Sequence, residues 1–162
     1  MTRINIRPAT PQDVGLIRHF VRELAEYEKA LEEAKASEQD FHQALFSDNP
    51  KVWSVICEID SEPAGFALYF FNYSTWTGKH GLFLEDLYVS PEYRGSGAGK
   101  ALLKHLAQIA VQSDCRRFEW NVLDWNQSAI DFYESFGARP QSEWVGYRLT
   151  GQALRDFASS QD

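Results

Sequence analysis

Cysteine is scarce in this sequence, and a long apolar run is missing. Its two cysteines, Cys57 and Cys115, form neither a CxxC motif nor a paired metal-ligand spacing, so they predict packed free thiols and no metal site. No stretch approaches the roughly 18 apolar residues of a membrane span. The first residues, MTRINIRPAT, lack the apolar segment of a secretion signal. We therefore expect a cytoplasmic protein.

Positive charge is also in short supply. Sixteen Lys and Arg residues stand against 23 Asp and Glu residues, which gives a formal net charge of −7 at pH 7. This balance argues against nucleic acid or an anionic membrane as the main partner. It suits a cationic partner, but a surplus of acids equally serves solubility, so charge alone leaves both explanations open.

The chain contains no repeat, low-complexity tract or linker, which predicts a single domain over residues 1–162. Its 44% hydrophobic and 14% aromatic residues suffice for a core. Apolar periodicity predicts helices at 11–31, 38–47, 100–112 and 127–136, and strands at 3–7, 52–59, 64–73, 82–89, 118–123 and 144–149. This order indicates an α/β class (mixed α+β), with a mixed sheet flanked by helices.

Helix-end signals support these boundaries. Thr10, Ser37 and Asn126 are placed as N-caps, with a Pro directly after Thr10 and acids three residues after Thr10 and Ser37. Gly137 is placed as the left-handed residue after the helix that Asn126 begins.

Three alternating glycines, Gly95, Gly97 and Gly99, lie between an expected strand and an expected helix. Glycines let backbone N–H groups approach a ligand closely, and a helix N-terminus favours an anion, so the segment predicts a phosphate cradle. A glycine-rich turn without a ligand is the alternative. Ala101 stands where a nucleoside triphosphate loop needs Ser or Thr, which argues against such a loop. The GxGxG spacing likewise argues against the dinucleotide motif GxGxxG.

Arg94-x-x-Gly97-x-Gly99 resembles the R/Q-x-x-G-x-G/A acyl-CoA loop of the GNAT acetyltransferases. Four other segments occur in the same order as in this family: the strand FLEDLYV before the loop, and after it Asp124-Trp125-Asn126, AIDFYE and a Gly-Ala pair. The segments IRPAT, ELAEYE and LED resemble the spermidine/spermine acetyltransferase branch, which includes enzymes acting on diamines and thialysine.

The resemblance implies a homodimeric GNAT fold that transfers an acetyl group from acetyl-CoA to an amine, without a covalent enzyme intermediate. Because a primary amine of pKa about 10.4 is protonated at pH 7, a base must receive its proton. The resemblance assigns that role to Glu85, for which an ordinary solvated acid is the alternative. Tyr133 matches the general acid that protonates the leaving thiolate, and a core tyrosine is its alternative.

The same resemblance supplies the binding residues. The expected acetyl-CoA contacts are Leu87, Tyr88, Val89, Arg94, Gly95, Ser96, Gly97, Ala98, Gly99, Lys100, Asn126, Gln127, Ser128 and Ala129. The expected acceptor contacts are Tyr27, Glu28, Trp76, Glu85, Asp86, Glu119, Trp120 and Asn121. Carboxylates and aromatic faces together suit an ammonium group.

The sequence departs from the polyamine enzymes at two acceptor positions, where Ser74 and Val145 replace acids, and Tyr147 replaces a tryptophan. Each distant ammonium needs its own counter-charge, so these changes favour a short acceptor such as thialysine, lysine, an ornithine-like amino acid or a diamine over spermine. A protein lysine or N-terminal acetyltransferase and an idle CoA-binding regulatory module remain the alternatives.

Overall fold

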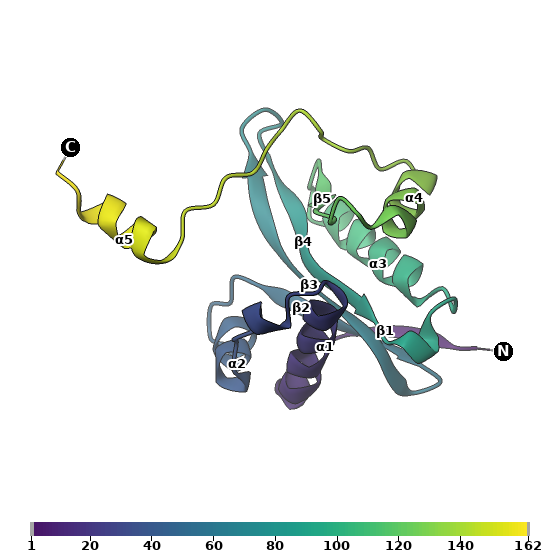
Figure 1. Ribbon diagram of the computed structural model, residues 1–162. Coiled ribbons are helices and arrows are strands. Elements are labelled where there is room, and N and C mark those ends of the chain that lie inside the picture. Colours follow the sequence, from purple (N-terminus) through teal and green to yellow (C-terminus); the bar gives the residue numbers. More distant parts are fainter. Residues whose placement is uncertain (1, 162) are drawn as a thin grey trace. The chain divides into compact units, whose positions relative to one another are not determined.

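The computed structural model describes residues 2–161, which form two compact units on either side of the peptide bond between Leu123 and Asp124 (Figure 1). Unit 1 contains β1 (Ile4–Pro8), η1 (Pro11–Asp13), α1 (Val14–Tyr27), η2 (Leu31–Glu33), α2 (Glu38–Phe46), β2 (Trp53–Ile59), β3 (Glu62–Ser74), β4 (Lys79–Val89), η3 (Pro91–Tyr93), α3 (Ala98–Gln112) and β5 (Phe118–Trp120). Unit 2 contains α4 (Gln127–Ser135) and α5 (Gly151–Ser159). The single domain over residues 1–162 stays a prediction.

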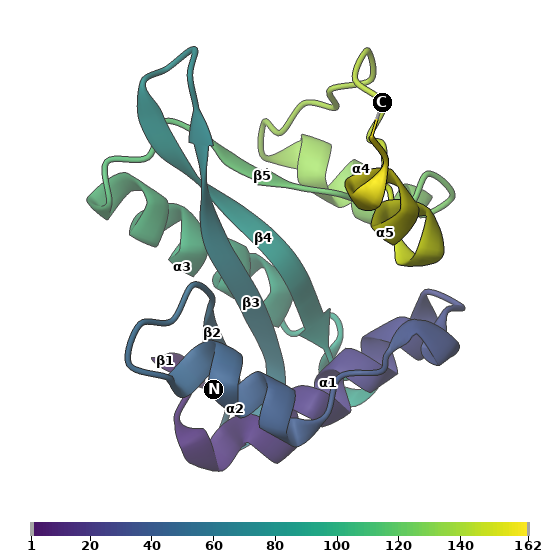
Figure 2. The same cartoon turned by 90° about the vertical axis from the view of Figure 1, so that its left-hand side faces the viewer.

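The sheet of unit 1 has the order β1-β2-β3-β4-β5. The first four strands pair antiparallel, and β5 joins β4 in parallel after the α3 crossover. Helices α1 and α2 cover one face, and α3 covers the other (Figures 1 and 2). A mixed sheet flanked by helices was predicted from the sequence and is confirmed.

The core under α1 is aromatic at its centre. Phe20 stacks on Phe66 with ring centroids 5.6 Å apart and contacts Tyr88 at 6.0 Å. Ile17, Ile56 and Leu68 complete this buried cluster. The cluster anchors α1 to β3 and β4, the two strands that carry the candidate site.

A β-bulge interrupts β4. Leu68 of β3 pairs with Asp86, whereas the next β3 residue, Tyr69, pairs with Leu84. Glu85 is therefore the extra residue of β4 and has no partner on β3. A bulge bends its strand and re-aims the side chains that follow it.

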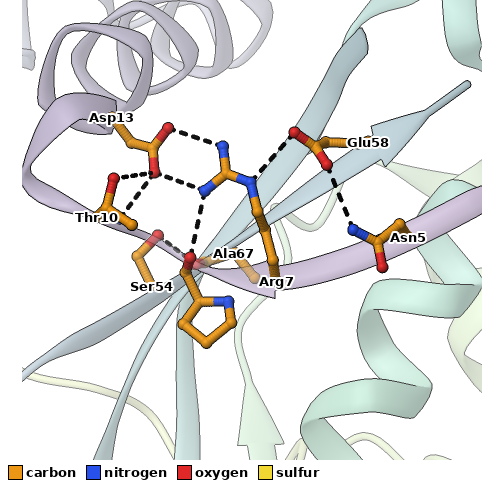
Figure 3. Close-up of polar contacts among 8 residues, drawn as sticks. Asn5, Arg7, Thr10, Asp13, Ser54, Glu58 and Ala67 are labelled. Carbon is orange, nitrogen blue, oxygen red and sulfur yellow. Dashed lines mark hydrogen bonds and ion pairs between the residues drawn. The ribbon is translucent and has the colours of Figure 1, made fainter. Parts of the chain in front are cut away.

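Asp13 organises the start of α1 (Figure 3). Arg7 grips its carboxylate with Nη1 at 2.7 Å and Nη2 at 2.9 Å, and the Thr10 amide donates to it at 2.7 Å. Arg7 Nε also donates to Glu58 of β2 at 3.1 Å. The capping box predicted from Thr10 is confirmed, and the network ties the edge strand β1 to this helix start.

We expect Asp13→Asn to lower the free energy of unfolding by about 2 kcal/mol at pH 7, because the substitution removes one partner of a largely buried ion pair. The Arg7 guanidinium lowers the pKa of Asp13. This stabilisation is therefore present above the unfolded-state value of 3.8 and is lost as pH falls through the lower folded-state pKa. Urea unfolding at pH 7 and pH 3 measures both effects. Equal stability at pH 7 would contradict the prediction, and Asp48→Asn in an exposed loop is the control.

Helix α1 ends earlier than its apolar pattern predicts. Lys29 adopts a left-handed φ of +63°, and the amide of Ala30 donates to the Ala25 carbonyl at 2.8 Å. This is the Schellman arrangement, formed here without the glycine that normally signals it. The prediction of a helix through Leu31 was wrong, because Leu31 lies in the separate short helix η2.

The C-terminal strand predicted at 144–149 is also absent. Among the described residues this segment has no strand partner, and a strand exists only through its ladder. Helix α5 was not predicted from the sequence. The prediction that the strand at 118 continues to residue 123 was wrong, because the pairing of β5 with β4 ends at Trp120. In α4, by contrast, the Asn126 cap and the left-handed Gly137 (φ +100°) are confirmed.

Candidate active site

The glycine loop adopts the backbone that its composition predicts. Gly95 and Gly97 have φ values of +80° and +92°, in the left-handed region that side chains disfavour. A Cβ at Gly95 would meet nothing within 4 Å, and one at Gly97 only the tip of Ile4 at 3.9 Å. Conformation rather than crowding therefore explains these two glycines.

Some amides of the loop donate hydrogen bonds within the protein and others do not. The Ser96 amide donates to the Tyr93 carbonyl at 3.3 Å, and the Ala98 amide to the Ser96 hydroxyl at 3.3 Å. Within residues 2–161 no acceptor is found for the amides of Gly95, Gly97, Gly99 and Lys100. Open amides at the start of α3 support the phosphate-cradle interpretation.

The end of β4 also has backbone amides that are not paired with another strand among the described residues. Within the part of the chain that the structure describes, β5 pairs only with Leu82 to Leu84, so β4 beyond the bulge has a neighbouring strand only on its β3 side. The amide of Ser90 donates to Ala64 at the start of β3. Because successive strand residues point to opposite edges, the amides of Leu87 and Val89 face the open edge. Both residues are among the acetyl-CoA contacts that the family resemblance predicts.

Three carboxyl groups interact beside this edge. Glu28 follows the last residue of α1, Glu85 is exposed on the bulge, and Asp86 is half-buried next to it. Burial raises the pKa of Asp86 to about 6, and repulsion from Glu85 and Glu28 adds to the shift. Burial also raises the pKa of Glu28. A cation placed here would relieve both the repulsion and the desolvation.

Strand register places Glu119 on the same face of the sheet as Asp86. It pairs with Phe83, which pairs with Phe70, the rings lying 5.2 Å apart. Phe70 lies two residues after Leu68, the partner of Asp86, and residues two apart share a face. Asp86, the Phe70–Phe83 pair and Glu119 therefore share the face covered by α1.

Other predicted acceptor residues are not brought to this face. Trp120 pairs with Leu84 and shares the opposite face with Phe118, at a ring distance of 4.9 Å. Asn121 follows β5 and is exposed. Trp76 is 80% exposed in the turn between β3 and β4. From the start of β4 to the bulge the strand advances about 20 Å, so Trp76 is remote from Asp86 within unit 1.

The remaining predicted residues belong to unit 2. The Asn126 side-chain oxygen accepts from the Ala129 amide at 3.3 Å and from the Ser128 hydroxyl at 3.3 Å, and Gln127 donates to Asp131 at 2.7 Å. Tyr133 is half-buried in α4. Its ring lies near those of Phe132 and Phe136. The catalytic and cofactor-binding roles of these residues stay predictions.

Arg94 is the residue whose contacts the sequence did not foresee. Its Nε donates to the Val89 carbonyl at 3.2 Å, and its guanidinium lies over the rings of Tyr27 and Tyr88. Residues 2–161 contain no group of three or more His, Cys, Asp or Glu side chains arranged to hold a metal ion. None of the helices in this range has the length and apolarity needed to cross a membrane.

Comparison with known proteins identifies the family. The pattern of the Acetyltransferase (GNAT) family matches residues 17–138. The chain belongs to the GNAT acetyltransferase family. It is an acyltransferase, and enzymes of this family take their acetyl group from acetyl-CoA. The resemblance predicted from the loop and strand motifs is thereby confirmed.

Relatives of this GNAT chain extend over its whole length. It is 41% identical to the thialysine N-epsilon-acetyltransferase of Sus scrofa, covering 98% of this chain and 99% of the relative. It is 36% identical to the human spermidine/spermine N(1)-acetyltransferase-like protein 1, covering 98% of this chain but 24% of that longer protein. An integron cassette protein from V. cholerae has a similar structure, with a TM-score of 0.80 at 32% identity and coverage of 97% and 98%.

Proposed function

We propose that this GNAT enzyme transfers an acetyl group from acetyl-CoA to a primary amine of a small cationic acceptor, such as a thialysine- or lysine-like amino acid or a diamine. Attack is direct, without a covalent enzyme intermediate. The observation that carries the proposal is the grouping of Glu28, Glu85 and Asp86 beside the open edge of β4. The name of the porcine relative supports this acceptor class.

The open amides of the glycine loop support binding of the acetyl-CoA phosphates, with Arg94 and Lys100 as the nearby cations. The amides of Leu87 and Val89 would then hold the thioester carbonyl, which gains negative charge as the amine attacks. Glu85, exposed on the bulge, receives the amine proton directly or through water. Tyr133 donates a proton to the departing thiolate.

Charge placement favours a short acceptor. Asp86 and Glu119 lie on the same face of the sheet as the Phe70–Phe83 pair. Along β4 three residues span about 10 Å, so the two carboxylates lie within reach of the two ends of one short acceptor. Ser74 and Val145 offer no carboxylate for a third or fourth ammonium.

The decisive experiment measures CoA release over thialysine, lysine, putrescine, spermidine, spermine and a lysine-containing peptide. We expect at least one short amine to reach a kcat/KM above roughly 10⁴ M⁻¹s⁻¹, with spermine about tenfold lower or worse. Turnover of the peptide alone would indicate a protein acetyltransferase. Binding of CoA without turnover of any acceptor would indicate a regulatory module.

We also propose a cytoplasmic homodimer. Trp144, Val145, Tyr147 and Leu149 are exposed, and within the described residues their segment pairs with no strand. Exposed aromatic and aliphatic side chains gathered in one segment are typical of protein interfaces. Light scattering that gave the mass of a single 18.6 kDa chain at micromolar concentration would contradict the dimer.

A further inference from the structure

Arg94 connects the glycine loop to the end of α1. Its guanidinium carbon lies 5.3 Å from the ring centroid of Tyr27 and 5.6 Å from that of Tyr88. Its Nε donates to the carbonyl of Val89 at 3.2 Å. A single side chain of the loop thus contacts both the last residue of α1 and the end of β4.

The two tyrosines differ in how firmly they are held. Tyr88 is 5% exposed and belongs to the core cluster around Phe20, so its ring is a fixed anchor. Tyr27 is 43% exposed and ends its helix, directly before Glu28. The guanidinium lies over the fixed ring and the exposed ring together. A guanidinium at this distance is attracted to the electrons of both rings, and its N–H groups remain able to donate hydrogen bonds.

We propose that Arg94 is a positioning residue for the acceptor: its guanidinium holds the Tyr27 ring against β4, beside Glu28 and Asp86. This inference rests on the proposed function, in which Tyr27 and Glu28 contact the amine. It adds a role for Arg94 on the acceptor side to the phosphate contact expected from the sequence. Loss of the planar guanidinium therefore weakens acceptor binding even where the positive charge is kept.

Arg94→Lys separates the two roles. Lysine keeps a positive charge for phosphate but lacks the planar fork that lies over the rings and donates through Nε. We expect the KM for the best amine acceptor to rise about 3- to 10-fold, with kcat within about threefold of the original. An unchanged acceptor KM with a raised acetyl-CoA KM would overturn the proposal, because Arg94 would then serve phosphate alone.

A double-mutant cycle tests whether the effect passes through Tyr27. In a Tyr27→Leu background, Arg94→Lys should raise the acceptor KM no further. Independent, multiplying effects of the two substitutions would overturn the proposal. Arg18→Lys is the matched control, because Arg18 Nε also donates to a backbone carbonyl, that of Ala36 at 3.3 Å. This control should keep the original acceptor KM.

An NMR measurement that needs no turnover tests the contact between Arg94 and Tyr27 independently of the proposed function. In protein with isotope-labelled tyrosine rings, the Tyr27 resonance is assigned by its loss in Tyr27→Phe. Arg94→Lys should shift that resonance and leave the resonance of Tyr73 unchanged. An unmoved Tyr27 resonance would overturn the proposal, whereas failure of every amine to turn over would overturn the proposed function and leave this test valid.

Discussion

Tyr133→Phe is expected to lower kcat by about 10²- to 10⁴-fold, the usual range for loss of a positioned general acid. A phenol of pKa about 10 is protonated at pH 7 and therefore starts in the donating state. Phenylalanine keeps the ring that lies near Phe132 and Phe136 but has no proton to give. Steady-state kinetics with the best amine of the acceptor panel measures this effect.

The control for this substitution is Tyr73→Phe, since Tyr73 is an exposed tyrosine near the end of β3. It removes the same hydroxyl group and should change kcat by less than about twofold. If Tyr133→Phe kept more than a tenth of kcat, the proton would come from another group or from water. Retained acetyl-CoA affinity would show that the variant lost chemistry and not its fold.

Local signals predicted the backbone conformation of the glycine loop. The alternation of glycine in the loop corresponds to left-handed φ values at Gly95 and Gly97, which are set by chemistry within a few residues. The capping box at Ser37 and the Asn126 cap are equally local, and both are present. A motif whose conformation depends on its own residues can be read from sequence.

Features that depend on distant partners could not be predicted in the same way. The bulge at Glu85 is defined by how β4 pairs with β3, and the residue types of the LED segment do not predict it. The contact of Arg94 with Tyr27 joins residues 67 positions apart. In segment 144–149 the local pattern was misleading. Its apolar residues alternate as in a strand, but among the described residues it pairs with no other strand.

Asp86→Asn is expected to raise the KM for a cationic acceptor by about 10- to 100-fold and to change its pH dependence. In the original protein the acceptor KM should fall as pH rises through about 6, because Asp86 then gains its negative charge. Asparagine has no charge to gain, so this transition should disappear. Kinetics between pH 5 and 8 measure it, and an unchanged transition would assign the titration to a group other than Asp86.

The same substitution should make the protein more stable at neutral pH. The pKa of Asp86 rises from 3.8 to about 6 on folding, so its ionisation opposes the folded state. The penalty is absent below pH 3.8, grows between 3.8 and about 6, and is complete above. Asp86→Asn should therefore gain about 2 kcal/mol in the free energy of unfolding at pH 7.5 and almost nothing at pH 3.5.

Asp48→Asn, in an exposed loop, provides the matched change without the buried charge. A stability gain at Asp86 combined with a loss of acceptor affinity would mean that the repulsion among Glu28, Glu85 and Asp86 is maintained for binding an ammonium group, at the expense of the fold. A loss of stability at pH 7.5 would instead mean that Asp86 is held by favourable contacts when charged, and its part in attracting a cation would fall with that result.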